Sequence, residues 1–150
     1  MKGLIVRMVL NAREAEDLAQ ETFVRVWQQR EKFRVGAEFR PWVFAIAVNL
    51  ARNRLRWWRR RPEIALEEWS ESTEGGATEN SMERSERAVA VRDAVAALPR
   101  ELREALVLFE YERLSHAEIA VTLGCTAKAV ESRLYRAREK LRKALQRFET

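Results

Sequence analysis

The sequence predicts an all-α protein, in which two small helical bundles are joined by an acidic flexible linker and the C-terminal bundle contains a helix-turn-helix. Only 5 glycines and 3 prolines occur in 150 residues, and apolar residues recur at helical spacing almost throughout. The composition changes in the middle, where residues 62–86 hold eight glutamates against one arginine. Such a segment is typical of a flexible tether. We therefore expect domains at residues 1–61 and 87–150, with the linker at residues 62–86.

The composition also narrows the classes of function. The chain carries 28 Lys and Arg against 23 Asp and Glu, a net charge of +5. This excess is modest for a nucleic-acid binder, so the distribution of charge matters more than its total. One cysteine, Cys125, and one histidine, His116, provide neither an internal disulfide nor a metal-ligand cluster. Without a glycine-rich phosphate loop or a nucleophile–base pair, we expect neither an enzyme nor a cofactor.

Neither export nor membrane insertion is expected. Arg7 interrupts the short apolar run near the N-terminus, and no small-residue cleavage site follows it. The longest apolar run elsewhere, WVFAIAV, is far shorter than the roughly 18 residues that span a bilayer. We therefore expect a soluble, cytoplasmic protein.

The first well-defined element is an amphipathic helix over Ala15–Arg30. Its inward face carries five residues at helical spacing: Ala15, Leu18, Ala19, Thr22 and Val26. Its outward side places an apolar pair among polar residues: Val24 and Trp27 among Asp17, Gln20 and Glu21. An exposed apolar pair with an acidic rim indicates a protein-binding surface. Ordinary packing against a neighbouring helix is the alternative.

A second helix is expected over Trp42–Arg56. Its broad core face carries six apolar residues: Phe44, Ala47, Val48, Leu50, Ala51 and Leu55. A narrow stripe gathers an aromatic ring, two amides and two guanidiniums: Trp42, Asn49, Arg52, Asn53 and Arg56. These groups suit single-stranded nucleic acid, because rings stack on bases, amides read base edges and guanidiniums bind phosphates. Trp57, Trp58 and Arg59–Arg61 extend the stripe, unless Trp42 is a core residue and the arginines are merely solvated.

The C-terminal domain contains the strongest motif, a helix-turn-helix. Ser115 and Glu118 form a capping box at the start of its first helix. Gly124 fits the left-handed residue that ends this helix, and Thr126 can cap the next one. The apolar face of the first helix consists of Ile119, Ala120 and Leu123.

The second helix of this motif has a core stripe and a polar face. The stripe consists of Val130, Leu134, Ala137 and Leu141. The opposite face carries Lys128, Ser132, Tyr135 and Arg136, with Glu131 on its edge and Arg133 and Arg138 on its flanks. Eight basic residues and two acids lie between Lys128 and Arg147. The pattern favours binding in the DNA major groove over a merely solvated helix face.

The chain closely resembles the extracytoplasmic-function sigma factors of bacterial RNA polymerase. Three segments carry the resemblance in the same order: AEDLAQETFVRVW, FRVGAEFRPWVFAIAVNLARNRLR and LPRELREALVLFEYERLSHAEIAVTLGCTAKAVESRLYRAREKLR. It covers nearly the whole chain except the linker. The resemblance implies a transcription initiation factor that binds the clamp and flap regions of core polymerase and recognises and melts promoters at their −35 and −10 elements. It also implies an anti-sigma factor as a partner.

The same resemblance assigns residues to three roles. The helix that docks on core polymerase would carry Asp17, Gln20, Glu21, Val24 and Trp27. The segment that melts and captures the −10 element would carry Phe39, Trp42, Asn49, Arg52 and Asn53, with Arg56 and Trp57 at its end. The helix that reads the −35 element would carry Lys128, Glu131, Ser132, Arg133, Tyr135 and Arg136. The linker would lead toward the active channel, where its glutamates can substitute for a nucleic-acid backbone.

The chain departs from the family pattern at two points. Family members usually carry about one more helix before the AEDL motif, so we expect a truncated start or an incomplete first bundle. Glu131 stands where many relatives have Lys or Arg; an acid there can accept from cytosine N4 but repels phosphate, which favours a different −35 sequence. The main alternative is a stand-alone helix-turn-helix regulator, which would leave the Trp/Arg stripe and the Val24/Trp27 pair unexplained.

Overall fold

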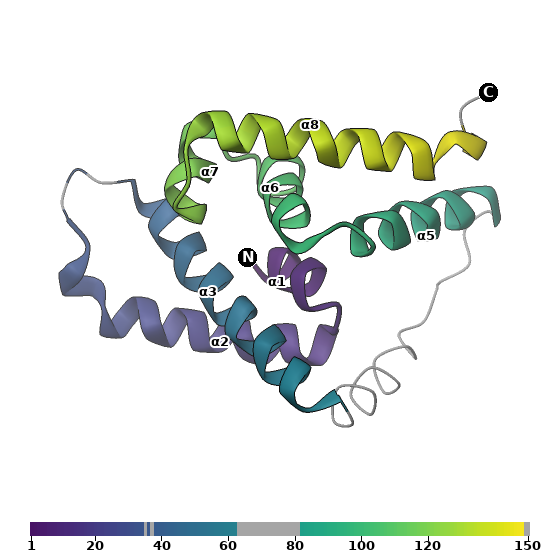
Figure 1. Ribbon diagram of the computed structural model, residues 1–150. Coiled ribbons are helices and arrows are strands. Elements are labelled where there is room, and N and C mark those ends of the chain that lie inside the picture. The colour runs from purple at the N-terminus through teal and green to yellow at the C-terminus, as the bar shows by residue number, and fades with distance from the viewer. Residues whose placement is uncertain (35, 37, 63–81, 149–150) are drawn as a thin grey trace.

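The computed structural model describes the chain except residues 35, 37, 63–81 and 149–150, so most of the predicted linker lies outside the described residues (Figure 1). Every regular element of the described part is a helix, which confirms the predicted all-α class. Residues 82–86, at the end of the predicted linker, form the start of α5 (Met82–Ala96). None of the described helices is both long and apolar enough to cross a membrane.

The N-terminal half consists of α1 (Lys2–Val9), α2 (Ala12–Gln28), the short 3-10 helix η1 (Arg30–Lys32) and α3 (Phe39–Arg60). α2 begins earlier than predicted because the Asn11 side chain accepts hydrogen bonds from the backbone N–H groups of Arg13 and Glu14. α3 extends beyond the predicted Trp42–Arg56 at both ends. Pro41 lies in its first turn, where a missing N–H leaves no helical hydrogen bond unmade.

The C-terminal half consists of α5, α6 (Arg100–Glu110), α7 (His116–Leu123), α8 (Ala127–Ala144) and the 3-10 turn η2 (Gln146–Phe148). α7 and α8 form the predicted helix-turn-helix, and both pack on α6. α8 lies across α6, with α7 at one end and α5 beneath its other end (Figure 1).

The two halves pack against each other. α1 lies near the centre, where it contacts α2 and α3 of its own half and α5 and α6 of the other (Figure 1). α3 packs along α7. Buried side chains from both halves consequently form one continuous hydrophobic cluster, which includes Leu4, Ile5, Val48, Leu108 and Leu134. The fold thus presents α2, one side of α3 and α8 on its outside.

Candidate nucleic-acid and protein-binding surfaces

The helix-turn-helix has the terminal contacts that its sequence predicts. The backbone N–H of Glu118 donates to Ser115 Oγ at 3.1 Å, and the N–H of Ser115 donates to Glu118 Oε1 at 3.0 Å. The hydrogen bond that the Ser115 N–H donates is the main cause of the lowered pKa of the Glu118 carboxyl. Gly124 ends α7 in the left-handed conformation with φ 67°, and Thr126 Oγ1 accepts from the N–H of Ala129 at 3.0 Å. These contacts fix the direction in which α8 begins.

α8 presents the predicted polar face to solvent. Its core side is buried through Val130, Leu134 and Ala137, with Leu141 half-buried. The exposed side carries Lys128, Glu131, Ser132, Tyr135 and Arg136. Tyr135 is 67% exposed, and Arg136 Nη2 donates to Ser132 Oγ one turn earlier at 3.2 Å. A phenol, an ammonium and a guanidinium therefore share one accessible face, as reading base edges and binding phosphates require.

The two flanking arginines of α8 differ from this face because neighbouring elements hold them. Arg133 is half-buried, and its Nη1 lies 3.6 Å from Cys125 Sγ in the turn. Arg138 forms an ion pair with Glu110 of α6 at 3.5 Å and lies over the Phe109 ring. Both guanidiniums thus stay beside the helix, where they border its exposed polar face.

The stripe predicted on α3 divides into two parts in the structure. Asn49, Asn53 and Arg56 are exposed, and Arg56 Nη2 donates to Asn53 Oδ1. Arg52 points toward the C-terminal half instead and is only 21% exposed. The stripe therefore keeps its two amides and one arginine open to solvent, whereas its second arginine is engaged inside the molecule.

An aromatic cluster stands at the start of α3. The rings of Phe33, Phe39 and Trp42 lie within 5.2–5.9 Å of one another, centroid to centroid. Phe39 is 54% exposed, so part of its ring is accessible to a base that stacks on it. Phe33 was not among the predicted site residues. The aromatic spacing in FRVGAEFRPW was the signal that could have included it.

Arg52 binds a carboxylate from the opposite half. Its Nε and Nη2 donate to Oε1 and Oε2 of Glu104 on α6, at 2.9 and 2.6 Å. Arg100 Nε lies 3.5 Å from the same carboxylate, and Glu104 is fully buried. The hydrogen bonds that Arg52 donates to Glu104 raise the pKa of the Arg52 guanidinium above its ordinary value. Sequence reasoning missed Glu104, although an acid within the apolar run of α6 was a signal that it has a buried partner.

At the basic end of α3, the arginines are exposed as predicted, whereas Trp58, the second tryptophan, is not. Arg59, Arg60 and Arg61 are exposed. Trp57 is half-buried, and the Arg61 guanidinium lies 4.5 Å from its ring centroid. The prediction for Trp58 was wrong: only 9% of it is exposed, within the core cluster. Trp58 lies about 160° around the helix from Trp42 of the stripe at 100° per residue, on the side that packs inward.

α2 carries an exposed apolar patch. Its inward residues Ala15, Leu18, Ala19 and Thr22 are buried, as predicted, and Val26 is half-buried. Outside, Val24 and Trp27 are 53% and 67% exposed, and Phe23, which the sequence reasoning missed, is 60% exposed. The guanidinium of Arg30 covers one side of the Trp27 ring at 4.0 Å. The polar rim consists of Asp17, Gln20 and Glu21, of which Glu21 pairs with Arg25.

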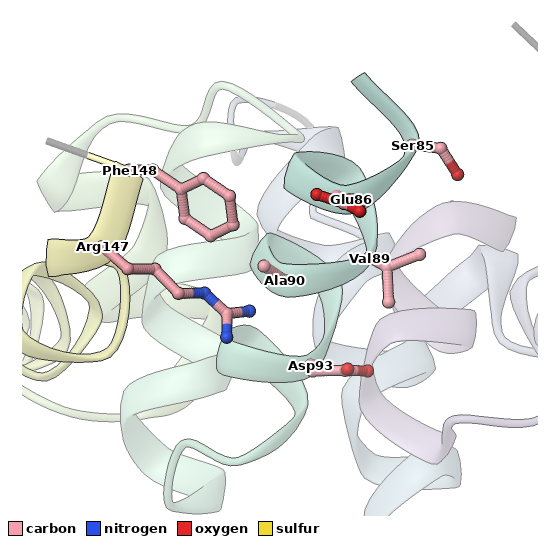
Figure 2. A pocket seen from close by; sticks show the side chains of 7 residues that line it. All are labelled: Ser85, Glu86, Val89, Ala90, Asp93, Arg147 and Phe148. Carbon is pink, nitrogen blue, oxygen red and sulfur yellow. The ribbon is translucent and has the colours of Figure 1, made fainter. Parts of the chain in front are cut away.

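A shallow groove of mixed character lies elsewhere on the part of the chain that the structure describes. It lies between α5 and η2 and is lined by Val89, Ala90 and Asp93 of α5 and by Arg147 and Phe148 of η2 (Figure 2). Among the described residues, no group of three or more His, Cys, Asp or Glu side chains is placed to hold a metal ion.

Comparison with protein families matches both halves of the chain. Residues 1–61 match sigma-70 region 2, and residues 88–141 match sigma-70 region 4. The first range contains the α2 patch and the α3 stripe, and the second contains the helix-turn-helix.

Similar proteins extend over nearly the whole chain. The RNA polymerase sigma-H factor of Pseudomonas aeruginosa is 41% identical, over 96% of this chain and 79% of its own. The ECF RNA polymerase sigma-E factor of Haemophilus influenzae is 36% identical, over 96% and 80%. Among solved structures, the sigma factor RpoE of Bartonella quintana, in complex with the anti-sigma factor NepR, is similar with a TM-score of 0.75 and 25% identity. That similarity covers 97% of this chain and 89% of the Bartonella chain.

Proposed function

Because this chain belongs to the extracytoplasmic-function sigma factors and is a promoter-recognition transcription initiation factor, we propose how its three surfaces divide the steps of initiation. The region 2 match over residues 1–61 accounts for the patch and the stripe that a stand-alone helix-turn-helix regulator leaves unexplained. In this proposal, residues 1–61 form the unit that binds polymerase and the −10 element, residues 62–86 form the linker, and residues 87–150 form the unit that binds the −35 element.

The −35 element is read by α8. The observation that carries this assignment is the exposed polar face of a helix whose start is fixed by the Gly124 turn and the Thr126 cap. Tyr135 and Arg136 reach base edges from the middle of the face, whereas Arg133 and the basic C-terminal part of α8 contact phosphates. Glu131 accepts from a cytosine N4 donor, so the element contains a C at the position that faces it.

The −10 element is captured by the aromatic cluster and the exposed side of α3. A base that leaves the duplex stacks on Phe39 or Trp42, and Asn49 and Asn53 offer amides to its edge. Arg56 and the arginines that follow it bind the backbone of the separated strand. Unstacking a base step costs a few kcal/mol, and stacking on a protein ring returns about 1–3 kcal/mol per base, so the rings offset much of this cost.

Core polymerase binds the α2 patch. Three large apolar side chains are exposed on this helix: Phe23, Val24 and Trp27. Their spacing of three and four residues places Phe23 and Val24 next to Trp27 on the helix surface. Such a cluster with a polar rim has the composition of a protein interface, where aromatic anchors supply most of the binding energy. We assign this patch to the polymerase clamp, and the C-terminal unit to its flap.

Two further assignments follow from the family. An anti-sigma factor is the expected regulatory partner, supported by the Bartonella relative, which was solved with one. The site of action is the cytoplasm, where polymerase and promoter are found. The protein acts by binding and positioning rather than by catalysing a reaction of its own.

A binding and transcription assay tests this function. The purified chain is incubated with bacterial core RNA polymerase in a pull-down, and the complex then transcribes genomic fragments, with core polymerase alone as the control. We expect stoichiometric binding and initiation sites that core polymerase alone does not use. If the chain retains duplex DNA but does not bind polymerase, the function is that of a stand-alone regulator.

A further inference from the structure

The α2 patch ends in a tryptophan whose side chain is held by an arginine that follows it. Arg30 is the first residue of η1, and its guanidinium lies 4.0 Å from the ring centroid of Trp27. Its Nη1 also donates a hydrogen bond to the backbone oxygen of Trp27 at 2.7 Å. One side chain therefore contacts both the ring and the main chain of the same residue.

The hydrogen bond follows from the place where α2 ends. The helix stops at Gln28, so the carbonyl groups of its last turn have no donor four residues further along the helix. The N–H of Gln29 reaches the backbone oxygens of Arg25 and Trp27. Arg30 Nη1 adds a second donor to the oxygen of Trp27, and the helix dipole, which is negative at this end, favours a cation there. The guanidinium is therefore anchored beside the ring through the main chain.

The contact with the ring uses the face of the indole. A planar guanidinium is attracted to the negative face of an aromatic ring within about 6 Å, and tryptophan is the best partner of this kind. Trp27 is 67% exposed, so the core does little to fix its orientation. Exposed side chains that nothing holds change rotamer within nanoseconds. Arg30 supplies the contact that keeps this ring in one place.

Arg30 differs in this respect from the other arginine near the end of α2. Arg25 forms an ion pair with Glu21 at 3.5 Å. Within the part of the chain that the structure describes, the Arg30 side chain contacts Trp27 alone, through its ring and its backbone oxygen. The position of the Arg30 guanidinium is therefore explained by Trp27 and not by a carboxylate.

The arrangement also determines which side of the indole a partner can use. The guanidinium lies over one side of the ring, so the other side and the ring edge remain for contact. Phe23 and Val24 precede Trp27 by about one helical turn and are exposed as well. A partner that covers all three side chains meets an indole whose orientation is set before binding. Such a side chain loses less conformational entropy when the complex forms.

We propose that Arg30 is a positioning residue for polymerase docking, which holds the Trp27 indole in the orientation that core polymerase binds. This inference rests on the proposed assignment of the α2 patch to polymerase. Ordering one side chain at an interface costs roughly 2- to 10-fold in affinity, so a side chain that is already ordered strengthens binding by that factor. Because Arg30 acts through Trp27, its effect must disappear when the indole is absent.

Fluorine NMR of the free, full-length chain reports on the ring without polymerase. The chain has five tryptophans, so labelling with 5-fluorotryptophan gives one signal for each, and Trp27→Phe identifies the signal of Trp27. We expect Arg30→Ala to shift this signal. Lys32→Ala is the matched control, because it removes the same charge from an exposed residue of the same 3-10 turn and should leave the Trp27 signal in place. A Trp27 signal that does not respond to Arg30→Ala would overturn the proposal.

Affinity for core polymerase measures the consequence for docking. We expect Arg30→Ala to weaken binding roughly 2- to 10-fold and Lys32→Ala to leave it unchanged. In the Trp27→Ala background, Arg30→Ala should cause no further loss, because the group that it positions is gone. An equal loss in both backgrounds would show that Arg30 contacts polymerase directly, and an equal loss for Lys32→Ala would show a general effect of charge. Either result would overturn the positioning role.

The two measurements also separate the role of Arg30 from the assignment of the patch. If Trp27→Ala binds polymerase as the wild type does, the proposed docking surface is wrong and the role of Arg30 in docking falls with it, while the fluorine signal still reports whether Arg30 holds the ring. If Trp27→Ala loses affinity and Arg30→Ala does not, the patch stands and only the role of Arg30 fails. Circular dichroism establishes that each full-length variant keeps its helices.

Discussion

Arginine side chains at the surfaces of this protein differ in how firmly the fold holds them, and that difference separates their roles. Arg136 is exposed on α8, where its contact is a hydrogen bond to Ser132 on the same helix. Arg138 lies two residues on but is tied to Glu110 and Phe109 of α6. A side chain that bonds only within its own helix can turn toward a base edge at little cost, whereas Arg138 must first leave its partners.

We therefore expect Arg136→Ala to weaken binding to −35 duplex DNA more than Arg138→Ala. Loss of a bidentate base contact costs about 1–3 kcal/mol, which is about 5- to 150-fold in affinity. Both substitutions remove one positive charge from α8, so the difference between them isolates the base contact from the general attraction to phosphate. Fluorescence anisotropy with duplexes from the mapped start sites measures both. Equal losses for the two variants would remove Arg136 from base recognition.

Individual residues show where sequence reasoning was sufficient. The core stripe of α8 and the inward face of α2 follow helical periodicity, and the structure buries both. Periodicity also places Trp58 on the core face of α3, where it is buried. The prediction that Trp58 extends the DNA surface was wrong because it followed the neighbouring arginines instead. Periodicity could not pair Arg52 with Glu104, since these residues are 52 positions apart and only tertiary packing joins them.

At the scale of elements, α7 depends on its capping box. An eight-residue helix is too short to be stable by itself, so its terminal contacts and its packing must stabilise it. The pKa of Glu118 is lowered chiefly because the Ser115 N–H donates to the carboxylate. A carboxyl whose pKa is lowered by folding stabilises the folded state fully at a pH above its unfolded pKa, which is about 4.3 for glutamate. This stabilisation is lost as the pH falls through the lower pKa that the carboxyl has in the folded state.

Because the charge of Glu118 stabilises the folded state only when the carboxyl is ionised, we predict that Glu118→Gln lowers the melting temperature at pH 7. The substitution should have little effect at a pH below the lowered pKa of Glu118. A glutamine can still accept from the Ser115 N–H, so the variant removes chiefly the charge. Ser115→Ala is the contrasting variant: it removes a neutral acceptor and should cost about 0.5–2 kcal/mol at every pH. Thermal unfolding followed by circular dichroism between pH 3 and pH 7 compares them. A Glu118→Gln effect that does not change with pH would contradict the role of the charge.

The element boundaries were predictable to about one turn, for physical reasons that differ between the helices. The start and end of α7 carry their own signals in Ser115, Glu118 and Gly124, and the structure uses all three. α3 extends a turn beyond the predicted range at each end. Pro41 in its first turn, the arginines in its last turn and Pro62 just beyond it are signals of these boundaries that the prediction did not use.

At the scale of the whole molecule, the packing of the two halves was not predictable from the sequence. Sequence patterns act locally, and an acidic tether suggests independent bundles rather than a shared core. The shared core arises because α1 is apolar on more than one side and contacts both halves. The exposed surfaces could be predicted better than the packing, since α2 and α8 each show one polar and one apolar face within a single helix.

The proposed assignment of surfaces makes polymerase binding and DNA binding separable, because the α2 patch and the α8 face belong to different halves. We expect Trp27→Ala to weaken binding to core polymerase by at least about 30-fold, as for an aromatic anchor worth about 2 kcal/mol or more. Trp27 is 67% exposed, so its loss should change the free energy of unfolding by no more than about 0.5 kcal/mol.

The same variant should bind −35 duplex DNA as the wild type does, because α8 is unaltered. A titration of the full chain against core polymerase and a separate anisotropy titration against DNA measure the two affinities, and Val24→Ala provides a smaller truncation within the same patch. A graded loss of polymerase binding, larger for Trp27→Ala than for Val24→Ala, identifies the patch as the docking surface. If polymerase and DNA binding fell together in a folded variant, the halves would not act as separate binding units, and the division proposed for initiation would be wrong.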